Sequence, residues 1–278
     1  MIVKSWWQLL RAEHGVIVFM AVVVSQFVVT GRLDESFLYP ALGPLLITWG
    51  AFAWGDYFGF KSDKALRRLD RPVVAGHIKR QHALWTGLLL MLTGLAATYP
   101  VGREAFAIAA VYTLFAFAYD PILKKKPFLG NAFIASAMSV SFLYGNVATS
   151  LPIDSRTGLY AAIAFLAGLG RELIITLRDV AGDKKIGATT LPMILGAKKT
   201  VLLSTVLVYA AVALSLVPLL RPVHAAYIAL VILTDALFLL GTYYALLSQK
   251  NEHLNSARQL TLYGMLFGVL AFAALGLQ

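Results

Sequence analysis

The run Ala225-Ala-Tyr-Ile-Ala-Leu-Val-Ile-Leu-Thr-Asp-Ala-Leu-Phe-Leu-Leu-Gly-Thr-Tyr-Tyr-Ala-Leu-Leu247 contains a single charged side chain, that of Asp235. A helix needs about 20 such residues to cross roughly 30 Å of membrane hydrocarbon. Similar apolar runs recur at Gly15–Thr30, Phe37–Phe58, His82–Tyr99, Ala105–Tyr119, Leu129–Leu151, Gly158–Leu177, Thr200–Leu220 and Leu260–Leu277. The sequence therefore predicts an all-α integral membrane protein, a bundle of about nine transmembrane helices around a central cavity.

The composition agrees with a membrane protein. Of the 278 residues, 59% are hydrophobic and 14% are charged, whereas soluble domains carry about 25% charged residues. The chain has no cysteine, which excludes a disulfide framework and a thiolate metal site, and its five histidines show no ligand spacing. We expect a single transmembrane domain over residues 1–278, with no linker.

The basic residues are sorted between the two sides of the predicted bundle. The loops after the second, fourth, sixth and eighth runs are rich in cations, whereas each loop on the other side holds one arginine: Arg32, Arg103, Arg156 and Arg221. The positive-inside rule then predicts a multi-pass cell-membrane protein whose N-terminus and cation-rich loops are cytoplasmic and whose C-terminus is outside. The net charge of +10 is thus explained by the orientation of the protein in the membrane, and no nucleic-acid partner is expected.

Two pairs of aspartates end apolar runs on the same side of the predicted membrane. Asp56 and Asp63 are spaced i and i+7, and Asp179 and Asp183 are spaced i and i+4. Each spacing puts both carboxylates of a pair on one face of a helix. Arginines and lysines follow or flank both pairs, so ion pairs at solvated helix ends are the plain alternative to a functional site.

This pattern fits the chemistry of a diphosphate. Carboxylate oxygens are the ligands that Mg²⁺ prefers, and Mg²⁺ commonly completes its shell with substrate phosphates. Neighbouring arginines and lysines bind the remaining phosphate oxygens and stabilise the charge that develops as the diphosphate leaves. An apolar interior would hold a hydrocarbon chain and exclude water from an allylic cation. The sequence thus predicts that Asp56, Asp63, Asp179 and Asp183 bind metal and act in catalysis.

The two stretches resemble the signature motifs of the UbiA superfamily of intramembrane prenyltransferases. The second motif is intact as Asp179-Val-Ala-Gly-Asp183, and Gly187-Ala-Thr-Thr-Leu-Pro192 after it is also typical of the family. The first motif departs from the family pattern, because Gly55 stands in place of an asparagine and Gly59 in place of the middle aspartate. The resemblance extends over the whole chain in topology.

A third stretch, Tyr119-Asp-Pro-Ile-Leu-Lys-Lys-Lys-Pro-Phe-Leu-Gly-Asn131, resembles the family's tyrosine-and-lysine loop. Its lysines also serve as orientation signals, Asp120 could equally be an ordinary loop residue, and Lys126 is expected at the surface. Together with the cations beside the aspartates, the resemblance implies substrate-binding roles for Arg67, Arg68, Arg71, Tyr119, Lys124, Lys125, Asn131 and Arg171.

The resemblance implies a Mg²⁺-dependent enzyme that moves a prenyl group from a prenyl diphosphate donor to a lipophilic acceptor among the membrane lipids. The runs Arg67–Gly76 and Arg171–Pro192 look most like archaeal members, which join geranylgeranyl diphosphate to geranylgeranylglyceryl phosphate in ether-lipid synthesis. Two alternatives stay open: an aromatic acceptor, as in quinone synthesis, and an ion-coupled transporter or non-catalytic lipid-phosphate binder.

Overall fold

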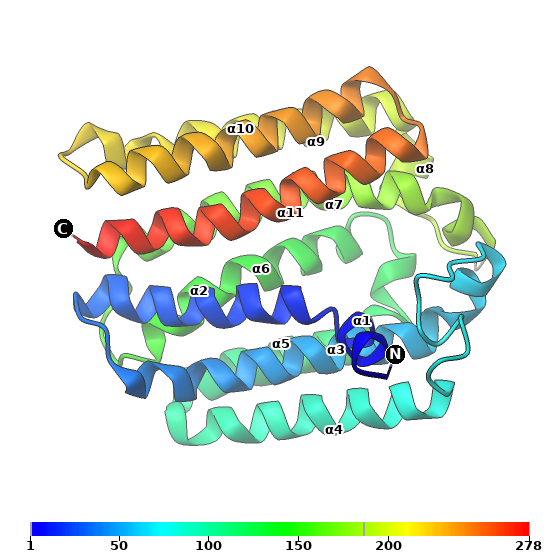
Figure 1. Cartoon of the computed structure of the whole chain (residues 1–278), viewed down its shortest axis with the longest axis horizontal. Coiled ribbons are helices and arrows are strands. Elements are labelled where there is room, and N and C mark those ends of the chain that lie inside the picture. The colour runs from blue at the N-terminus through cyan, green and yellow to red at the C-terminus, as the bar shows by residue number, and fades with distance from the viewer. Residues whose placement is uncertain (1, 186, 278) are drawn as a thin grey trace.

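The computed structural model describes residues 2–185 and 187–277, and within them all regular structure is helical (Figure 1). The α-helices are α1 (Ile2–Leu10), α2 (Ala12–Thr30), α3 (Leu38–Ala65), α4 (Arg80–Thr98), α5 (Arg103–Tyr119), α6 (Leu129–Val147), α7 (Ser155–Lys185), α8 (Leu191–Leu195), α9 (Ala197–Ser215), α10 (Ala225–Leu247) and α11 (Asn251–Ala274). Short 3₁₀ helices are η1 (Glu35–Phe37), η2 (Tyr99–Val101), η3 (Leu123–Lys125), η4 (Val217–Leu220) and η5 (Leu275–Leu277).

Seven helical segments in the described part of the chain are long and apolar enough to cross a membrane: Ala12–Thr30, Glu35–Ala65, Arg80–Val101, Ser155–Lys185, Ala197–Leu220, Ala225–Leu247 and Asn251–Leu277. The predicted all-α membrane bundle is confirmed, but the predicted count of nine is not. The two remaining long helices are α5, which has only 17 residues, and α6, which is interrupted by glycine, asparagine and serine. Their status as spans stays a prediction.

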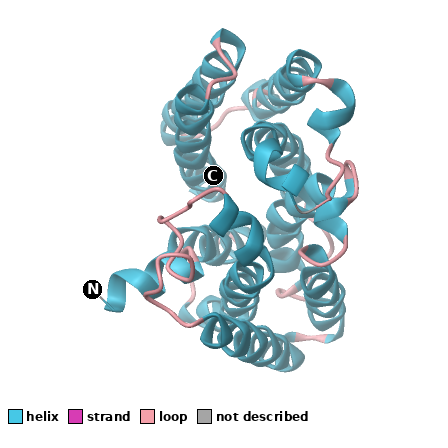
Figure 2. Cartoon of the chain, turned by 90° about the vertical axis from the view of Figure 1, so that its right-hand side faces the viewer, coloured by secondary structure: helices cyan, strands magenta, loops and turns pink. Residues whose placement is uncertain are grey.

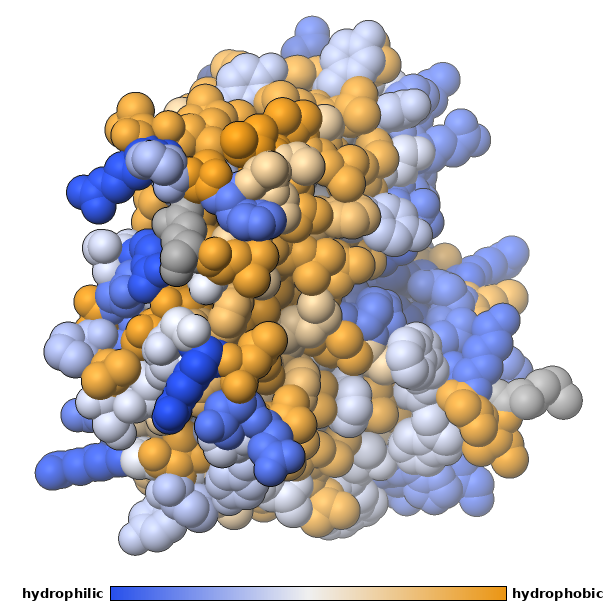
Figure 3. Space-filling view, turned by 60° about the vertical axis from the view of Figure 1, so that its left-hand side comes forward, coloured by the Kyte–Doolittle hydropathy of each residue, from blue (hydrophilic) through white to orange (hydrophobic). Residues whose placement is uncertain are grey.

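The outer surface of the bundle suits contact with lipid. Leucines such as Leu220, at 84% exposed, and Leu114, at 69%, face outward. Figure 3 shows apolar side chains over much of one face, with hydrophilic side chains gathered toward its margins. An apolar exterior of this kind would be unstable in water and is normal in hydrocarbon.

Successive long helices run antiparallel, so that one end of the bundle collects the turns after α3, α5, α7 and α10 (right in Figure 1), while the C-terminal end of α11 lies at the other. Helix α2 packs against α3, α6 and α11. Figure 2, which looks nearly along the helices, shows them arranged around the middle of the bundle. Both helices with aspartate pairs, α3 and α7, end at the same side.

Helices α3 and α4 approach each other through glycines spaced seven residues apart, Gly43 and Gly50 on α3 and Gly87 and Gly94 on α4. A Cβ atom added at Gly87 would lie 2.7 Å from the backbone nitrogen of Trp54, and one at Gly94 would lie 2.8 Å from the carbonyl oxygen of Gly43. Small residues at such spacing let two membrane helices pack backbone to backbone. This packing supports the helix that carries the first aspartate pair.

An arginine joins three helices at the opposite end of the bundle. Arg156, in the first turn of α7, donates hydrogen bonds to the carbonyl oxygens of Val28 at 2.8 Å and Leu275 at 3.5 Å, and it pairs with Asp154 at 2.9 Å. The hydrogen bonds from Arg156 hold the pKa of Asp154 below its ordinary value. The ends of α2, α7 and α11 are thus fixed together far from the aspartate pairs.

Candidate functional site

All four predicted acidic residues, Asp56, Asp63, Asp179 and Asp183, line one cavity of about 900 Å³. Most of the charged side chains come from α3, α7 and the loops at that side of the bundle, and Glu13 on α2 and Arg258 on α11 add to them. The rest of the wall is mostly apolar and is built from α2, α3, α5, α6, α7 and α11. A molecule bound there would have a charged head among the acids and bases and a hydrocarbon chain inside the bundle.

The ends of α3 and α7 touch each other at Gly182, the glycine within the second motif. A Cβ atom at Gly182 would overlap the side chain of Leu66 and lie 3.0 Å from the Oγ of Ser62. Beside this contact, Lys185 Nζ donates a hydrogen bond of 3.1 Å to the carbonyl oxygen of Ala65. The absence of a side chain at Gly182 therefore allows the two acidic helix ends to meet.

The first aspartate pair is bound by arginines. Asp56 is 3% exposed, and its Oδ1 lies 3.4 Å from Arg71 Nη1 and 3.5 Å from Arg11 Nη2. Its other oxygen, Oδ2, is buried and has no hydrogen-bond partner. Asp63 Oδ1 lies 3.3 Å from Arg68 Nη1, and Asp63 Oδ2 lies 3.9 Å from Arg71 Nε. Burial lowers the pKa of Arg71 to about 10, which still leaves this arginine charged at neutral pH.

In the second aspartate pair, Asp179 accepts two hydrogen bonds from Arg178, of 2.9 and 3.0 Å. Asp183 is 5% exposed. Arg68 lies between the two pairs: burial opposes its charge, but Asp179 and Asp63 together raise the pKa of Arg68. In the described residues, the carboxylates face the cavity as separate pairs, and no three acidic or histidine side chains form a preformed metal cluster.

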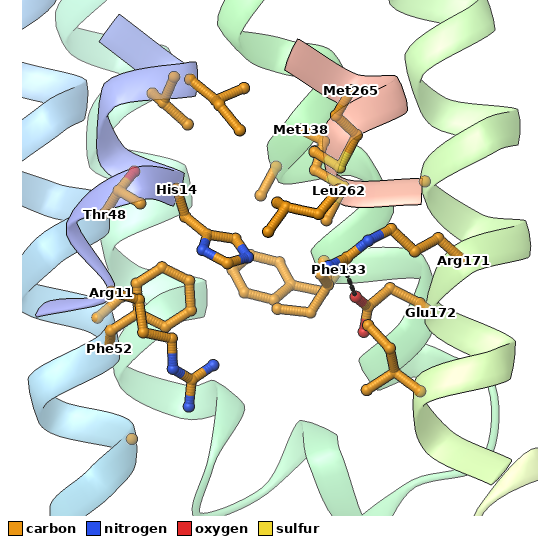
Figure 4. A pocket seen from close by; sticks show the side chains of 18 of the residues that line it. Arg11, His14, Thr48, Phe52, Phe133, Met138, Arg171, Glu172, Leu262 and Met265 are labelled. Atoms are coloured by element: carbon orange, nitrogen blue, oxygen red, sulfur yellow. Dashed lines mark hydrogen bonds and ion pairs between the residues drawn. The ribbon is translucent and has the colours of Figure 1, made fainter. Parts of the chain in front are cut away.

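A further ion pair lies deeper in the cavity. Arg171 is 2% exposed and its Nη1 lies 3.2 Å from Glu172 Oε1. The amide of Asn131 donates to the carbonyl oxygen of Glu172 at 3.4 Å and to the hydroxyl of Thr176. Figure 4 shows Arg171 and Glu172 on one wall, opposite Arg11. Asn131 thus fixes α6 to α7 beside the cavity.

Gly55, which replaces the asparagine of the family motif, leaves room for an acid from another helix. A Cβ atom at Gly55 would lie 2.8 Å from Asp120 Oδ2. Asp120 lines the cavity just after α5, where burial raises its pKa, and it pairs with Lys124 at 3.8 Å. The interpretation of Asp120 as an ordinary loop residue is therefore incomplete. At Gly59, a Cβ atom would meet only Asp63 Oδ2, at 3.5 Å.

Six of the eight predicted substrate-binding residues line the cavity: Arg68, Arg71, Tyr119, Lys124, Asn131 and Arg171. Arg67 and Lys125 are exposed and are not part of its wall. Arg67 has a left-handed backbone, with a φ of 52°, just beyond α3, and the carbonyl oxygen of Lys125 accepts a hydrogen bond from the Thr189 backbone. Lys126, expected at the surface, is exposed and also borders the cavity.

The cavity residues that were not predicted from the sequence include Arg11, His14 and Arg258. Arg11 reaches Asp56 because it connects α1 to α2 with a left-handed backbone, at a φ of 44°. His14 packs edge-on against Phe52, with ring centroids 5.2 Å apart. The position of Arg11 depends on the turn between α1 and α2, which hydrophobic periodicity does not reveal.

The cavity is charged at one end and apolar inside the membrane bundle. Such a cavity is typical of a membrane protein that binds a lipid with an anionic head group. The model of the UbiA prenyltransferase family matches residues 16–266. The digeranylgeranylglyceryl phosphate synthase of Archaeoglobus fulgidus is 32% identical to this chain, over 98% of this chain and 94% of that protein.

Solved structures share the fold. A structure of digeranylgeranylglyceryl phosphate synthase has a TM-score of 0.69 at 24% identity and covers 99% of both chains. A UbiA homologue from Archaeoglobus fulgidus bound to DMAPP and Mg²⁺ has a TM-score of 0.63 at 17% identity, covering 96% of this chain and 99% of that one. The chain belongs to the UbiA prenyltransferase family, and it is an enzyme of the prenyltransferase class.

Proposed function

We propose that this enzyme transfers a geranylgeranyl group from geranylgeranyl diphosphate to geranylgeranylglyceryl phosphate. The observation that carries the proposal is the meeting of two acidic helix ends, with arginines between them, at the polar end of one largely apolar cavity. The names of the relatives support the choice of acceptor, because the similar protein from Archaeoglobus fulgidus is a digeranylgeranylglyceryl phosphate synthase.

The acidic residues fit a divalent metal. Asp56, Asp63, Asp179 and Asp183 supply carboxylate oxygens, which suit Mg²⁺, and the buried Asp56 Oδ2 has no hydrogen-bond donor of its own. A UbiA homologue of the same fold binds DMAPP and Mg²⁺, which supports the assignment. Bound Mg²⁺ would neutralise the negative charge that develops on the departing diphosphate.

The cations of the site bind the donor. Arg68 and Arg71 hold the first aspartate pair, and Lys124 pairs with Asp120, four residues earlier in the chain. These side chains need to move only a short distance to bind a phosphate oxygen in place of a carboxylate. Arginine can bind a phosphate through two parallel hydrogen bonds. They orient the diphosphate so that the allylic carbon points into the bundle.

The apolar wall completes the reaction site. Residues such as Ile47, Ile108, Met138 and Met265 line the cavity away from the charged end. They hold the prenyl chain and exclude water, so the allylic carbon is attacked by the acceptor hydroxyl rather than hydrolysed. The bond from carbon to diphosphate oxygen breaks, an ether bond forms, and the hydroxyl proton is released.

The decisive experiment offers the purified enzyme geranylgeranyl diphosphate with either geranylgeranylglyceryl phosphate or 4-hydroxybenzoate, and identifies the products by mass spectrometry. We expect the ether product with the glyceryl phosphate, release of diphosphate only when Mg²⁺ is present, and no aromatic product. An aromatic product alone would assign a quinone-type acceptor. No diphosphate release with either acceptor would refute the proposed reaction.

We also propose that the charged end of the cavity faces the cytoplasm. The support is the clustering of cations at that end, which the positive-inside rule assigns to the cytoplasmic side. The chain has no cysteine, so single cysteines can be introduced without background. A membrane-impermeant maleimide applied to intact cells should label Arg221→Cys and leave Lys125→Cys unlabelled; the reverse pattern would overturn the orientation.

A further inference from the structure

Three guanidinium groups face the cavity from three different elements with an unused hydrogen-bond donor each. Arg11 lies between α1 and α2, Arg171 on α7 and Arg258 on α11, and the Nε of each is buried without a partner. The fourth such nitrogen, that of Arg71, belongs to the aspartate site, because it lies 3.9 Å from Asp63 Oδ2. Buried donors without acceptors are costly, so three of them in one cavity favour the binding of an anion.

The charges of this group are not balanced. Figure 4 shows Arg11 and Arg171 projecting into the cavity from opposite walls. Arg171 lies within electrostatic range of Arg258, Arg178 and Arg11, which repel it, and it forms an ion pair with Glu172. Arg11 shares Asp56 with Arg71. An anion bound among the three arginines would relieve a repulsion that an apolar environment makes stronger than it would be in water.

Arg171 lies deeper in the cavity than the second aspartate pair, whereas Arg258 is within electrostatic range of Asp179 and Arg11 pairs with Asp56. Arg171 precedes Asp179 by two helical turns, which is roughly 12 Å along α7. Guanidinium groups that approach from three directions suit a tetrahedral group whose several oxygens point apart, whereas a carboxylate offers two oxygens in one plane. A phosphate attached to a lipid therefore fits the group better than a carboxylate does.

We propose that Arg11, Arg171 and Arg258 bind the phosphate monoester of the acceptor lipid, at a site that adjoins the one that binds the donor diphosphate. This inference rests on the proposed function, since it assumes an acceptor that carries a phosphate. In a glyceryl phosphate, the reacting hydroxyl is two carbons away from the phosphate oxygen. The phosphate can thus be held by the arginines while the hydroxyl faces the allylic carbon of the donor.

The test begins with binding alone, which needs no turnover. Dodecyl phosphate is added to the purified wild-type enzyme with and without EDTA, and dodecanol serves as the phosphate-free control. We expect dodecyl phosphate, but not dodecanol, to raise the melting temperature in the presence of EDTA, because no metal takes part at this site. Binding that is lost in EDTA, or equal binding of dodecanol, would overturn the inference.

The Arg258→Gln variant then identifies the site, with Arg221→Gln, an exposed arginine at the opposite end of the bundle, as the matched control. Arg258→Gln should weaken dodecyl phosphate binding and raise the KM for the phosphorylated acceptor by about tenfold or more, as expected for loss of a charge-assisted hydrogen bond. The KM for geranylgeranyl diphosphate should stay within about twofold.

The outcomes separate the two proposals. If Arg258→Gln leaves dodecyl phosphate binding unchanged, or raises both KM values equally, the assignment of an acceptor phosphate site to these arginines is wrong. If wild-type enzyme binds dodecyl phosphate through Arg258 but makes no product from the phosphorylated acceptor, the phosphate site holds and the proposed acceptor fails. Arg258→Lys, which keeps the charge, should restore part of the binding and so distinguish recognition from a packing defect.

Discussion

Replacing Gly87 by alanine tests whether the close contact of α3 and α4 supports the bundle. The new Cβ atom would lie 2.7 Å from the backbone nitrogen of Trp54 and 3.0 Å from the carbonyl oxygen of Gly50, where ordinary contacts begin at 3.4 Å. Because both neighbours are backbone atoms, no side chain can rotate away. Helix α4 must instead move from α3 by about 0.7 Å, the difference between 2.7 and 3.4 Å.

The magnitude follows from two opposing effects. Overpacking of a tight interface costs about 1–3 kcal/mol. Alanine also favours the helix over glycine by about 1 kcal/mol, which hides part of that cost. Gly158, inside α7, provides the matched control, because a Cβ atom there would have no neighbour within 4 Å. The difference between Gly87→Ala and Gly158→Ala therefore isolates the steric effect.

The assay is the thermal unfolding of both variants in the same detergent. Gly158→Ala should melt at or above the wild-type temperature, and Gly87→Ala should melt below Gly158→Ala by roughly 2–4 °C for each kcal/mol. Equal melting temperatures for the two variants would refute the argument that backbone contact between α3 and α4 limits stability.

Three other changes test the site and the far end of the bundle. Asp183→Asn should lower kcat for diphosphate release by about 100-fold or more with an unchanged melting temperature, and activity near the wild-type level would count against its metal role. Gly59→Asp should leave activity equal or raise it in a Mg²⁺ titration, since the new side chain has room beside Asp63, and a sharp loss would contradict this. Asp154 has a pKa lowered by Arg156, so its contribution to stability is present above its ordinary pKa of 3.8 and is lost as the pH falls through the lowered value. The wild-type melting temperature should therefore drop more between about pH 5 and pH 3 than that of Asp154→Asn; parallel curves would argue against a role for the pair.

The sequence predicted those features that depend on regular helices. Long apolar runs predicted the membrane bundle, and helical spacing put Asp179 beside Asp183 and Asp56 beside Asp63. Because α3 and α7 end at the same side of the bundle, their aspartates reach one cavity, as the alternation of charged loops indicates. The Asp183→Asn variant tests the catalytic role of Asp183, and the catalytic roles of Asp56, Asp63 and Asp179 stay predictions.

Features that depend on turns and on contacts between helices were not predictable in this way. Arg11 precedes the first predicted apolar run, Gly15–Thr30, and the left-handed turn at its own backbone brings it to Asp56. Asp120 reaches the cavity because Gly55, far away in sequence, has no side chain to block it. Arg67 and Lys125 are of the same residue types as their neighbours Arg68 and Lys124, which line the cavity. The path of the loops leaves Arg67 and Lys125 outside the cavity wall.

Gly182 determines how closely the two acidic helix ends can approach each other. Because Gly182 has no side chain, the end of α7 can lie directly against Leu66 and Ser62 at the end of α3. The distance between the two acidic helix ends therefore depends on this residue. A Gly182→Ala enzyme would keep every carboxylate and every cation and yet hold the two walls further apart. Its activity would therefore tell whether catalysis needs only the presence of these charges or also their fixed separation.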